Sequence, residues 1–150
     1  MNQNVWGSSF WFTLENIAYN YPIKPTDNDK DNIKKFLECL QYVLPCGICR
    51  KNYKMELEQR PIRLNSRKEL VYWLFEIHND VNSRTGKRLY TFEEAVNEYE
   101  KKIGGKIELG DNEIHKLRYE ISEIDKKFIM IVILLILFIV ILLNLKKIKK

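Results

Sequence analysis

The chain has 150 residues, 45% of them hydrophobic and 30% charged, which suits one globular domain with a core and leaves too little chain for two. Six lysines, at positions 126, 127, 146, 147, 149 and 150, exceed the net charge of +5, and subtracting them leaves −1 for residues 1–125. The basic composition is therefore no support for nucleic-acid binding, and three cysteines are too few for the disulfide framework of a small secreted domain.

Two amphipathic helices are predicted in the first 44 residues. The first covers residues 6–20, where apolar residues recur at helical spacing until the break at "YPIKP". The second covers residues 27–44 and places its apolar residues on one face: Ile33, Phe36, Leu37, Leu40, Val43 and Leu44. Cys39 lies alongside this face, so we expect it to be a small core residue.

A third helix is predicted over residues 45–59. Pro45 cannot continue the preceding helix but suits the start of a new one, which places Cys46 in a first helical turn. The fourth helix begins after Ser66, because Ser66 and Glu69 form a capping-box pattern, and Gly86 is the expected residue at its end.

A short fifth helix closes the predicted domain. Thr91 and Glu94 form a second capping-box pattern, and the helix continues to about Lys102 before the glycines at 104 and 105. The pattern contains no strand of any length. Residues 1–103 are therefore predicted to form one all-α domain, followed by a charged stalk over residues 104–127.

Residues 128–145 are predicted to form a transmembrane helix, followed by a basic tail over residues 146–150. An apolar run of 16 residues, 128–143, spans roughly 24 Å as a helix, and flanking lysine stems extend its reach towards a hydrocarbon core of about 30 Å. A buried core helix is the alternative, but a small domain cannot cover a helix that is apolar on every face. The first residues show no signal-peptide pattern. We expect a single-pass C-terminal membrane anchor with the domain facing the cytosol.

The stretch "LPCGICR", residues 44–50, places two cysteines at C-x-x-C spacing. Such a pair is typical of a redox-active disulfide, of half a zinc site, or of two inert buried thiols. A helix N-terminus lowers a thiol pKa, and Arg50 and Lys51 add positive charge nearby. A zinc site would need Cys39 and His78 as further ligands, whereas structural zinc sites usually use two close-set pairs. A helix precedes the motif, which argues against a thioredoxin fold. We therefore favour a redox-active pair.

A polar cluster lies at the end of the predicted fourth helix, in "HNDVNSRTGK" at residues 78–87. His78 and Asn82 share a helix face with Val81, and Asn79 lies one step round the helix. Burying an imidazole and two amides without partners is costly, so the cluster indicates a polar ligand or a hydrogen-bond network. Lys87, beyond the Gly86 turn, is placed to meet a phosphate. Amides that only cap the helix end are the alternative.

Three separated motifs resemble the Erv/ALR family of FAD-linked sulfhydryl oxidases. They are "WGSSFWFTLENIAYNYP" at 6–22, "LPCGIC" at 44–49 and "LVYWLFEIHNDVNSRTGK" at 70–87, in the family's order. The resemblance implies a four-helix bundle with a short fifth helix across it, FAD held non-covalently at the mouth of the bundle, and a homodimer.

The resemblance also implies residue roles. Cys46 would exchange with a client dithiol, Cys49 would lie against the isoalloxazine of FAD, and reduced FAD would pass two electrons to O₂ to give H₂O₂. The expected cofactor-binding residues are Gly7, Ser8, Trp11, Glu15, His78, Asn79, Val81, Asn82 and Lys87, and no metal is expected. Among these, the family's pattern has a histidine at the position of Glu15 and an arginine-like residue at that of Ser8.

Two further departures concern disulfides. Phe75 and Phe92 occupy positions where many family members have a structural disulfide, so we predict an aromatic contact in its place. The chain lacks a second, shuttle cysteine pair, so a client dithiol protein, thioredoxin-like or another small carrier, would have to reach Cys46 directly.

This combination most resembles the versions encoded by large cytoplasmic DNA viruses, which form disulfides in virion proteins. We therefore expect the chain at a membrane in the host cytoplasm or in the virion. The alternative function is a non-catalytic, membrane-tethered helical adaptor with a zinc or structural thiol site.

Overall fold

The computed structural model describes residues 3–110 and 130–131. In residues 3–110 all regular structure is helical: α1 (Gln3–Tyr19), α2 (Asp27–Val43), α3 (Gly47–Gln59), α4 (Arg67–Arg84) and α5 (Phe92–Ile103). The all-α prediction is confirmed for this range. Residues 111–127 of the predicted stalk and the whole basic tail lie outside the described residues, as does the predicted membrane segment apart from residues 130 and 131. Within the described part of the chain, no helix has the length and apolar character needed to cross a membrane.

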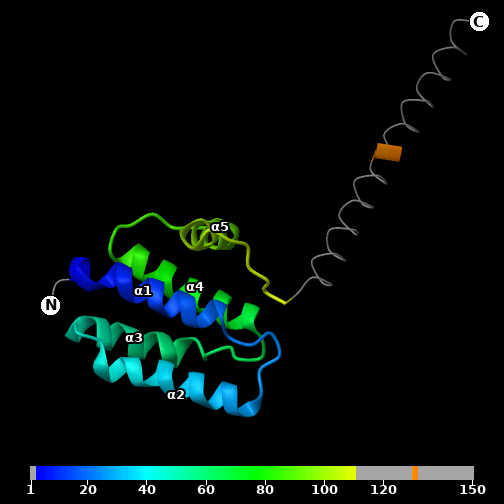
Figure 1. Ribbon diagram of the computed structural model, residues 1–150. Coiled ribbons are helices and arrows are strands. Elements are labelled where there is room, and N and C mark those ends of the chain that lie inside the picture. Colours follow the sequence, from blue (N-terminus) through cyan, green and yellow to red (C-terminus); the bar gives the residue numbers. More distant parts are fainter. Residues whose placement is uncertain (1–2, 111–129, 132–150) are drawn as a thin grey trace, which may run out of the picture. The chain divides into compact units, whose positions relative to one another are not determined.

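The first four helices form a bundle of two pairs. α1 packs along α4, and α2 packs along α3. Figure 1 shows the two pairs as layers, with α5 crossing on the side of α1 and α4. The chain forms one compact unit up to Gly110. The unit therefore includes residues 104–110, whose Ile107 and Leu109 pack against the core.

Capping groups explain where the helices begin. Thr26 and Asp29 form a capping box before α2, and Thr91 and Glu94 form the predicted one before α5. The hydrogen bonds from Thr26 lower the pKa of the Asp29 carboxyl, so it remains ionised as a cap. Before α4 only half of the predicted box forms, because Glu69 Oε2 accepts from the N–H of Asn65.

The structure corrects the prediction for Cys46. We expected this residue inside a first helical turn, but it is the N-cap of α3, with extended dihedrals of φ −125° and ψ 122°. Its sulfur accepts from the backbone N–H of Cys49 at 3.3 Å, which satisfies one of the free donors of the first turn. The capping role thus holds the first cysteine just outside the helix.

The prediction that Cys39 is a core residue is also wrong. The buried stripe of α2 contains Leu37 and Leu40, whereas Cys39 is exposed. Phe36 and Val43, which we placed on the same apolar face, are 38% and 61% exposed. The apolar face predicted from periodicity was wider than the stripe that is buried. Cys39 lies at the edge of the predicted face, outside the buried stripe.

The core centres on α4. Trp73 is fully buried, and Leu70 and Ile77 are almost fully buried on the same helix. The indole Nε1 of Trp73 donates to the carbonyl of Arg60 at 3.1 Å, so the buried donor is satisfied by the residue that ends α3. This contact ties α4 to the α2–α3 pair.

An aromatic cluster links α4 to α5. Phe75 and Phe92 meet edge to face with ring centroids 5.4 Å apart, which confirms the predicted contact. Tyr72 contacts both rings, at 5.7 and 5.0 Å, and the Arg63 guanidinium lies 5.3 Å from the centroid of Tyr72. The described residues contain one disulfide, Cys46–Cys49, so no covalent bond joins these two helices there.

Replacement of Phe75 by alanine tests this cluster. We expect Phe75→Ala to lower the free energy of unfolding of residues 1–110 by roughly 1–3 kcal/mol, because it removes two aromatic contacts and leaves a partial cavity. Urea unfolding followed by circular dichroism measures the change. Tyr42→Ala, at a ring that is 73% exposed, is the control and should change it by less than about 0.5 kcal/mol. Equal effects of the two substitutions would contradict a stabilising role for the cluster.

Candidate functional site

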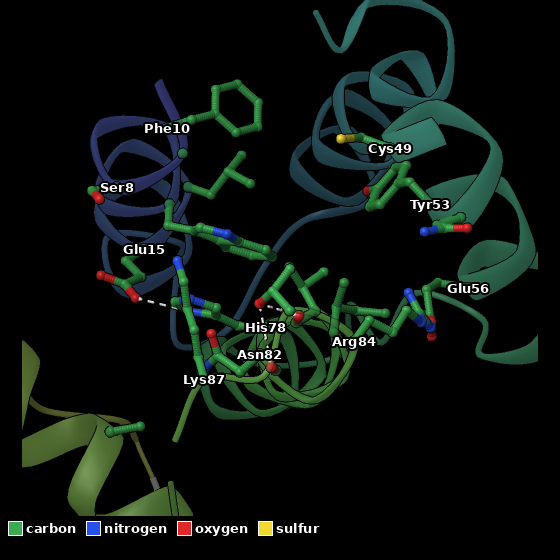
Figure 2. Close-up of a pocket in the computed structure, with 18 of the residues that line it drawn as sticks. Ser8, Phe10, Glu15, Cys49, Tyr53, Glu56, His78, Asn82, Arg84 and Lys87 are labelled. Atoms are coloured by element: carbon green, nitrogen blue, oxygen red, sulfur yellow. Dashed lines mark hydrogen bonds and ion pairs between the residues drawn. The ribbon is translucent and has the colours of Figure 1, made fainter. Parts of the chain in front are cut away.

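A cavity of about 390 Å³ opens between the two helix pairs. Its wall residues on α1 lie between Trp6 and Glu15, and those on α4 lie in the C-terminal half, from Ile77 to Arg84. The core residues Ala18 and Tyr19 of α1 and Leu70, Val71, Trp73 and Leu74 of α4 lie beyond these stretches, whereas Leu14 and Ile77 belong to both sets. Figure 2 shows α3 side chains on one wall and α1 and α4 side chains on the other. The cavity therefore occupies one end of the bundle.

Most of the predicted binding residues line this cavity. The structure brings together, around one space, Gly7, Ser8, Trp11 and Glu15 from α1, His78, Val81 and Asn82 from α4, and Lys87 from the following loop. Cys49 also lines it, whereas Cys46 and Asn79 do not. Segments that are about 30 to 40 residues apart in the sequence thus supply a single site.

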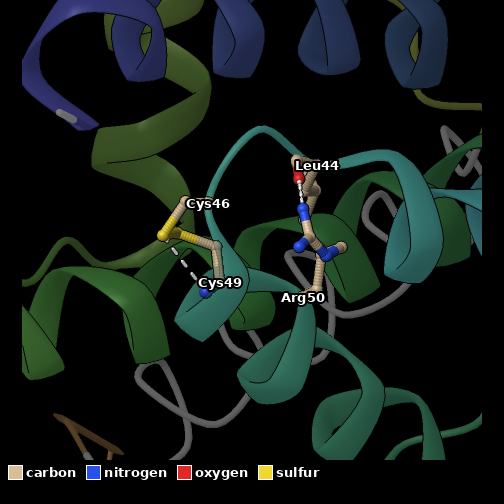
Figure 3. The surroundings of a disulfide bond; sticks show 4 residues. All are labelled: Leu44, Cys46, Cys49 and Arg50. Carbon is tan, nitrogen blue, oxygen red and sulfur yellow. Dashed lines mark hydrogen bonds between the residues drawn. A yellow bond between two sulfur atoms is a disulfide. The ribbon is translucent and has the colours of Figure 1, made fainter. Parts of the chain in front are cut away.

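Cys46 and Cys49 form a disulfide at the N-terminus of α3, with their Cα atoms 5.1 Å apart (Figure 3). Cys46 is only 8% exposed. The pair is thus oxidised, with one sulfur at the cavity wall and the other at the turn between α2 and α3. Disulfide exchange would release a thiolate at Cys49, which the helix N-terminus stabilises.

The predicted alternative of a zinc site would need Cys39 and His78 beside this pair. Cys39 is exposed on α2, and His78 stacks on Trp11 of α1. Among residues 3–110 and 130–131, no three or more histidine, cysteine or acidic side chains are grouped so as to hold a metal ion. The geometry of the described residues favours redox chemistry at Cys46 and Cys49.

A flat aromatic pair forms part of the wall opposite α3. The rings of Trp11 and His78 stack at 4.0 Å with 5° between their planes. Glu15 flanks the pair, with one oxygen 3.5 Å from His78 Nδ1 and the other 3.5 Å from Lys102 Nζ. These are ion-pair distances, and the Oε2 atom of Glu15 is buried without a hydrogen bond.

A second buried polar atom of the cavity wall also makes no hydrogen bond. The indole Nε1 of Trp6 is a donor with no acceptor. Trp6 thus presents a donor with no hydrogen bond, and Glu15 presents an oxygen held only by the ion pair with Lys102, at the same cavity. Such atoms are costly to bury, so they indicate a ligand that supplies both an acceptor and a donor.

Asn79 holds the loop that follows α4. Its side-chain amide donates to the carbonyl of Tyr90 at 2.7 Å and accepts from the Tyr90 N–H at 3.1 Å. Both hydrogen-bonding ends are therefore engaged by one backbone residue. Asn79 fixes the end of the loop that carries Lys87, and the backbone N–H of Lys87 is itself bound to the Asn82 carbonyl at 2.8 Å.

Four cations line the cavity, and three of them are paired. Arg84 pairs with Glu56, Arg88 with Glu94, and Lys102 with Glu15. Within the described ranges Lys87 makes no ion pair with a carboxylate and is exposed. Lys87 is therefore the cavity cation best placed to bind an anionic ligand.

The sequence prediction missed the face of α3 that follows Cys49. Asn52, Tyr53 and Glu56 line the cavity at helical spacing from that cysteine, so the spacing itself was a usable signal. The Tyr53 hydroxyl donates to the Leu37 carbonyl at 3.0 Å, and burial, with a smaller effect of Glu38, raises the pKa of this phenol, which stays protonated at neutral pH.

Glu56 begins a chain of charged contacts between α3 and α4. It is 3% exposed and pairs with Arg84, while Arg60 lies 3.6 Å from it. Arg60 also contacts Asp80 at 2.8 Å and Glu76 at 4.0 Å. A buried carboxylate needs such partners, and these contacts join α3 to α4 beside the cavity.

The family model described as Erv1 / Alr matches residues 8–101. A probable FAD-linked sulfhydryl oxidase of Acanthamoeba polyphaga mimivirus is 42% identical over 106 residues, covering 69% of this chain and 74% of the relative. An FAD-linked sulfhydryl oxidase of African swine fever virus is 33% identical over 111 residues, covering 70% and 88%. Among solved structures, the FAD-binding domain of Erv1 from Saccharomyces cerevisiae superposes with a TM-score of 0.61 at 32% identity, covering 68% of this chain and 93% of that one.

Proposed function

This chain belongs to the Erv1 / Alr family, and on that premise we propose how its own residues oxidise thiols. It is an FAD-linked thiol oxidase that converts two thiols and O₂ into a disulfide and H₂O₂. The main evidence that this cavity is the active site is the position of Cys49. This cysteine belongs to the redox-active pair and also lines the cavity.

The residues present fit FAD in three respects. The Trp6 indole N–H and the Glu15 oxygen, neither of which makes a hydrogen bond, match a ligand with hydrogen-bonding groups of both kinds. The flat Trp11–His78 pair suits a planar ring system, and Lys87 suits a diphosphate. The cavity thus offers complementary chemistry for each part of the cofactor.

We assign the ends of the cofactor from the position of the cysteines. The isoalloxazine belongs beside Cys49, and the adenosine end belongs beside the Trp11–His78 pair and Asn82, with Lys87 at the phosphates. Gly7, Ser8, Glu15 and Val81 complete the binding wall. Asn79 acts by holding the loop, since both ends of its amide are bound to Tyr90.

The thiol chemistry begins at Cys46. A client thiolate attacks Cys46 Sγ, the Cys46–Cys49 bond breaks, and Cys49 leaves as a thiolate stabilised by the N-terminus of α3. A second client thiolate attacks the mixed disulfide and releases Cys46, so the client leaves oxidised and the enzyme pair holds two electrons. When bound, FAD accepts this electron pair and passes it to O₂.

The client must approach the turn between α2 and α3. The chain has only three cysteines, and the third, Cys39, is a free thiol that cannot shuttle a disulfide alone. The client is therefore a dithiol protein, thioredoxin-like or another small carrier, that reaches Cys46 directly. A homodimer, as the family resemblance implies, belongs to this proposal.

The proposed location is a membrane, with the domain on the cytosolic side. The apolar run at 128–143, with lysines on both sides, supports the membrane location. Two of the similar proteins are viral, which supports a viral setting. The proposed role is to form disulfides in virion proteins, in the host cytoplasm or at the virion membrane.

Substitution of Cys49 tests the oxidase. The purified chain should be yellow, and dithiothreitol should bleach the flavin absorbance until air restores it. We expect Cys49→Ser to retain FAD but to lower oxygen consumption with dithiothreitol to the buffer background, because the pair can no longer close. Cys39→Ser is the matched control and should consume oxygen at the wild-type rate. A colourless protein with stoichiometric zinc would instead support the non-catalytic adaptor.

Vesicle binding tests the location. The full chain should co-sediment with vesicles containing anionic lipid, because its apolar run and lysines would both bind them. Residues 1–110 should stay in the supernatant. If the full chain also stayed in the supernatant, the proposed membrane anchor would be refuted.

A further inference from the structure

Arg50, the residue directly after the C-x-x-C motif, links the two helices that meet at the redox-active turn. Its Nη1 donates to the carbonyl of Leu44 at 2.6 Å. Leu44 is the C-cap of α2, and α2 has no basic residue in its own last turn. The guanidinium of α3 therefore supplies the cation that the carbonyl end of α2 lacks.

The contact spans the turn that contains Cys46. Leu44, Pro45 and Cys46 connect α2 to α3, and the backbone N–H of Arg50 donates to the carbonyl of Cys46 at 3.0 Å. The side chain of Arg50 thus binds the turn before Pro45, and its backbone N–H, which any residue except proline would supply, binds the turn after Pro45. Figure 3 shows the guanidinium and the disulfide flanking this turn.

The contact matters most when the disulfide is open. In the oxidised protein, a covalent bond fixes Cys46 against Cys49. In the dithiol and in the mixed disulfide that bond is absent, and the turn depends on its hydrogen bonds. Among the described residues Arg50 makes no ion pair with a carboxylate, so its charge is directed to the Leu44 carbonyl.

We propose that Arg50 is a positioning residue that keeps Cys46 within reach of Cys49 while the disulfide is open. Without it, the reduced turn gains conformational freedom that the oxidised turn cannot gain, so closing the disulfide becomes less favourable. This inference rests on the proposed oxidase function and concerns how easily the pair recloses.

The test is the equilibrium in which the enzyme dithiol and oxidised glutathione give the enzyme disulfide and two reduced glutathiones. It is run without oxygen on the full, FAD-loaded chain, quenched with acid, and read by mass spectrometry after thiol alkylation. We expect Arg50→Met to lower the equilibrium constant about tenfold, which is the effect of freeing roughly one backbone residue in the reduced turn only. Arg50→Lys, which keeps a charged donor, should recover most of this loss.

Lys51→Met is the matched control. It removes the same charge one position later, from an exposed side chain, and should change the constant less than about twofold. If Arg50→Met fails to fold, Arg50→Gln and Lys51→Gln replace the pair under the same criteria. Equal effects at 50 and 51, no effect at 50, or no recovery with lysine would each overturn the inference. One of these results in a protein that is yellow and active would overturn only the role of Arg50. A colourless protein would instead contradict the oxidase proposal.

Discussion

Burial of Trp73 between the two helix pairs is the constraint on which the rest of the structure depends. The indole is fully buried and bonded to the carbonyl of Arg60, so it holds the α1–α4 pair against the α2–α3 pair. Other core residues, among them Leu14, Tyr53 and Ile77, form the boundary between the core and the cavity, so the helices stay packed where the cavity begins. The cavity is thus a consequence of where the large side chains are placed. A domain of this size cannot leave such a space unless the remaining core is well packed.

The redox pair uses this arrangement in a simple way. Cys46 caps α3 from outside the helix and Cys49 lies inside it, so one sulfur belongs to the turn and the other to the cavity wall. The same helix continues the wall with Asn52, Tyr53 and Glu56. Glu56 in turn pairs with Arg84 on α4, which joins α3 to α4 at the cavity wall. Exchange at this disulfide would therefore leave the electrons of a client on a pair whose second cysteine lines the cavity.

Much of this could be predicted from the sequence, because the signals are local. Apolar spacing and capping residues located five helices, and Pro45 marked the turn before the cysteines. The family motifs predicted nine binding residues, and eight of them line one cavity. The exposure of Cys39 was missed because periodicity defines the direction of a face better than its width. The contacts of Arg88, Lys102 and Asn79 were also missed, since they depend on how α5 and its preceding loop return to the bundle.

The central claim is that Cys49 is the cysteine that faces the flavin. A crystal structure of residues 1–110 with FAD bound measures this directly, through the distances from each cysteine sulfur to the isoalloxazine ring. The account predicts Cys49 Sγ in van der Waals contact with the ring, within about 4 Å, and Cys46 Sγ farther away at the turn. A ring that lies nearer to Cys46 than to Cys49, or an isoalloxazine bound outside this cavity, would contradict it.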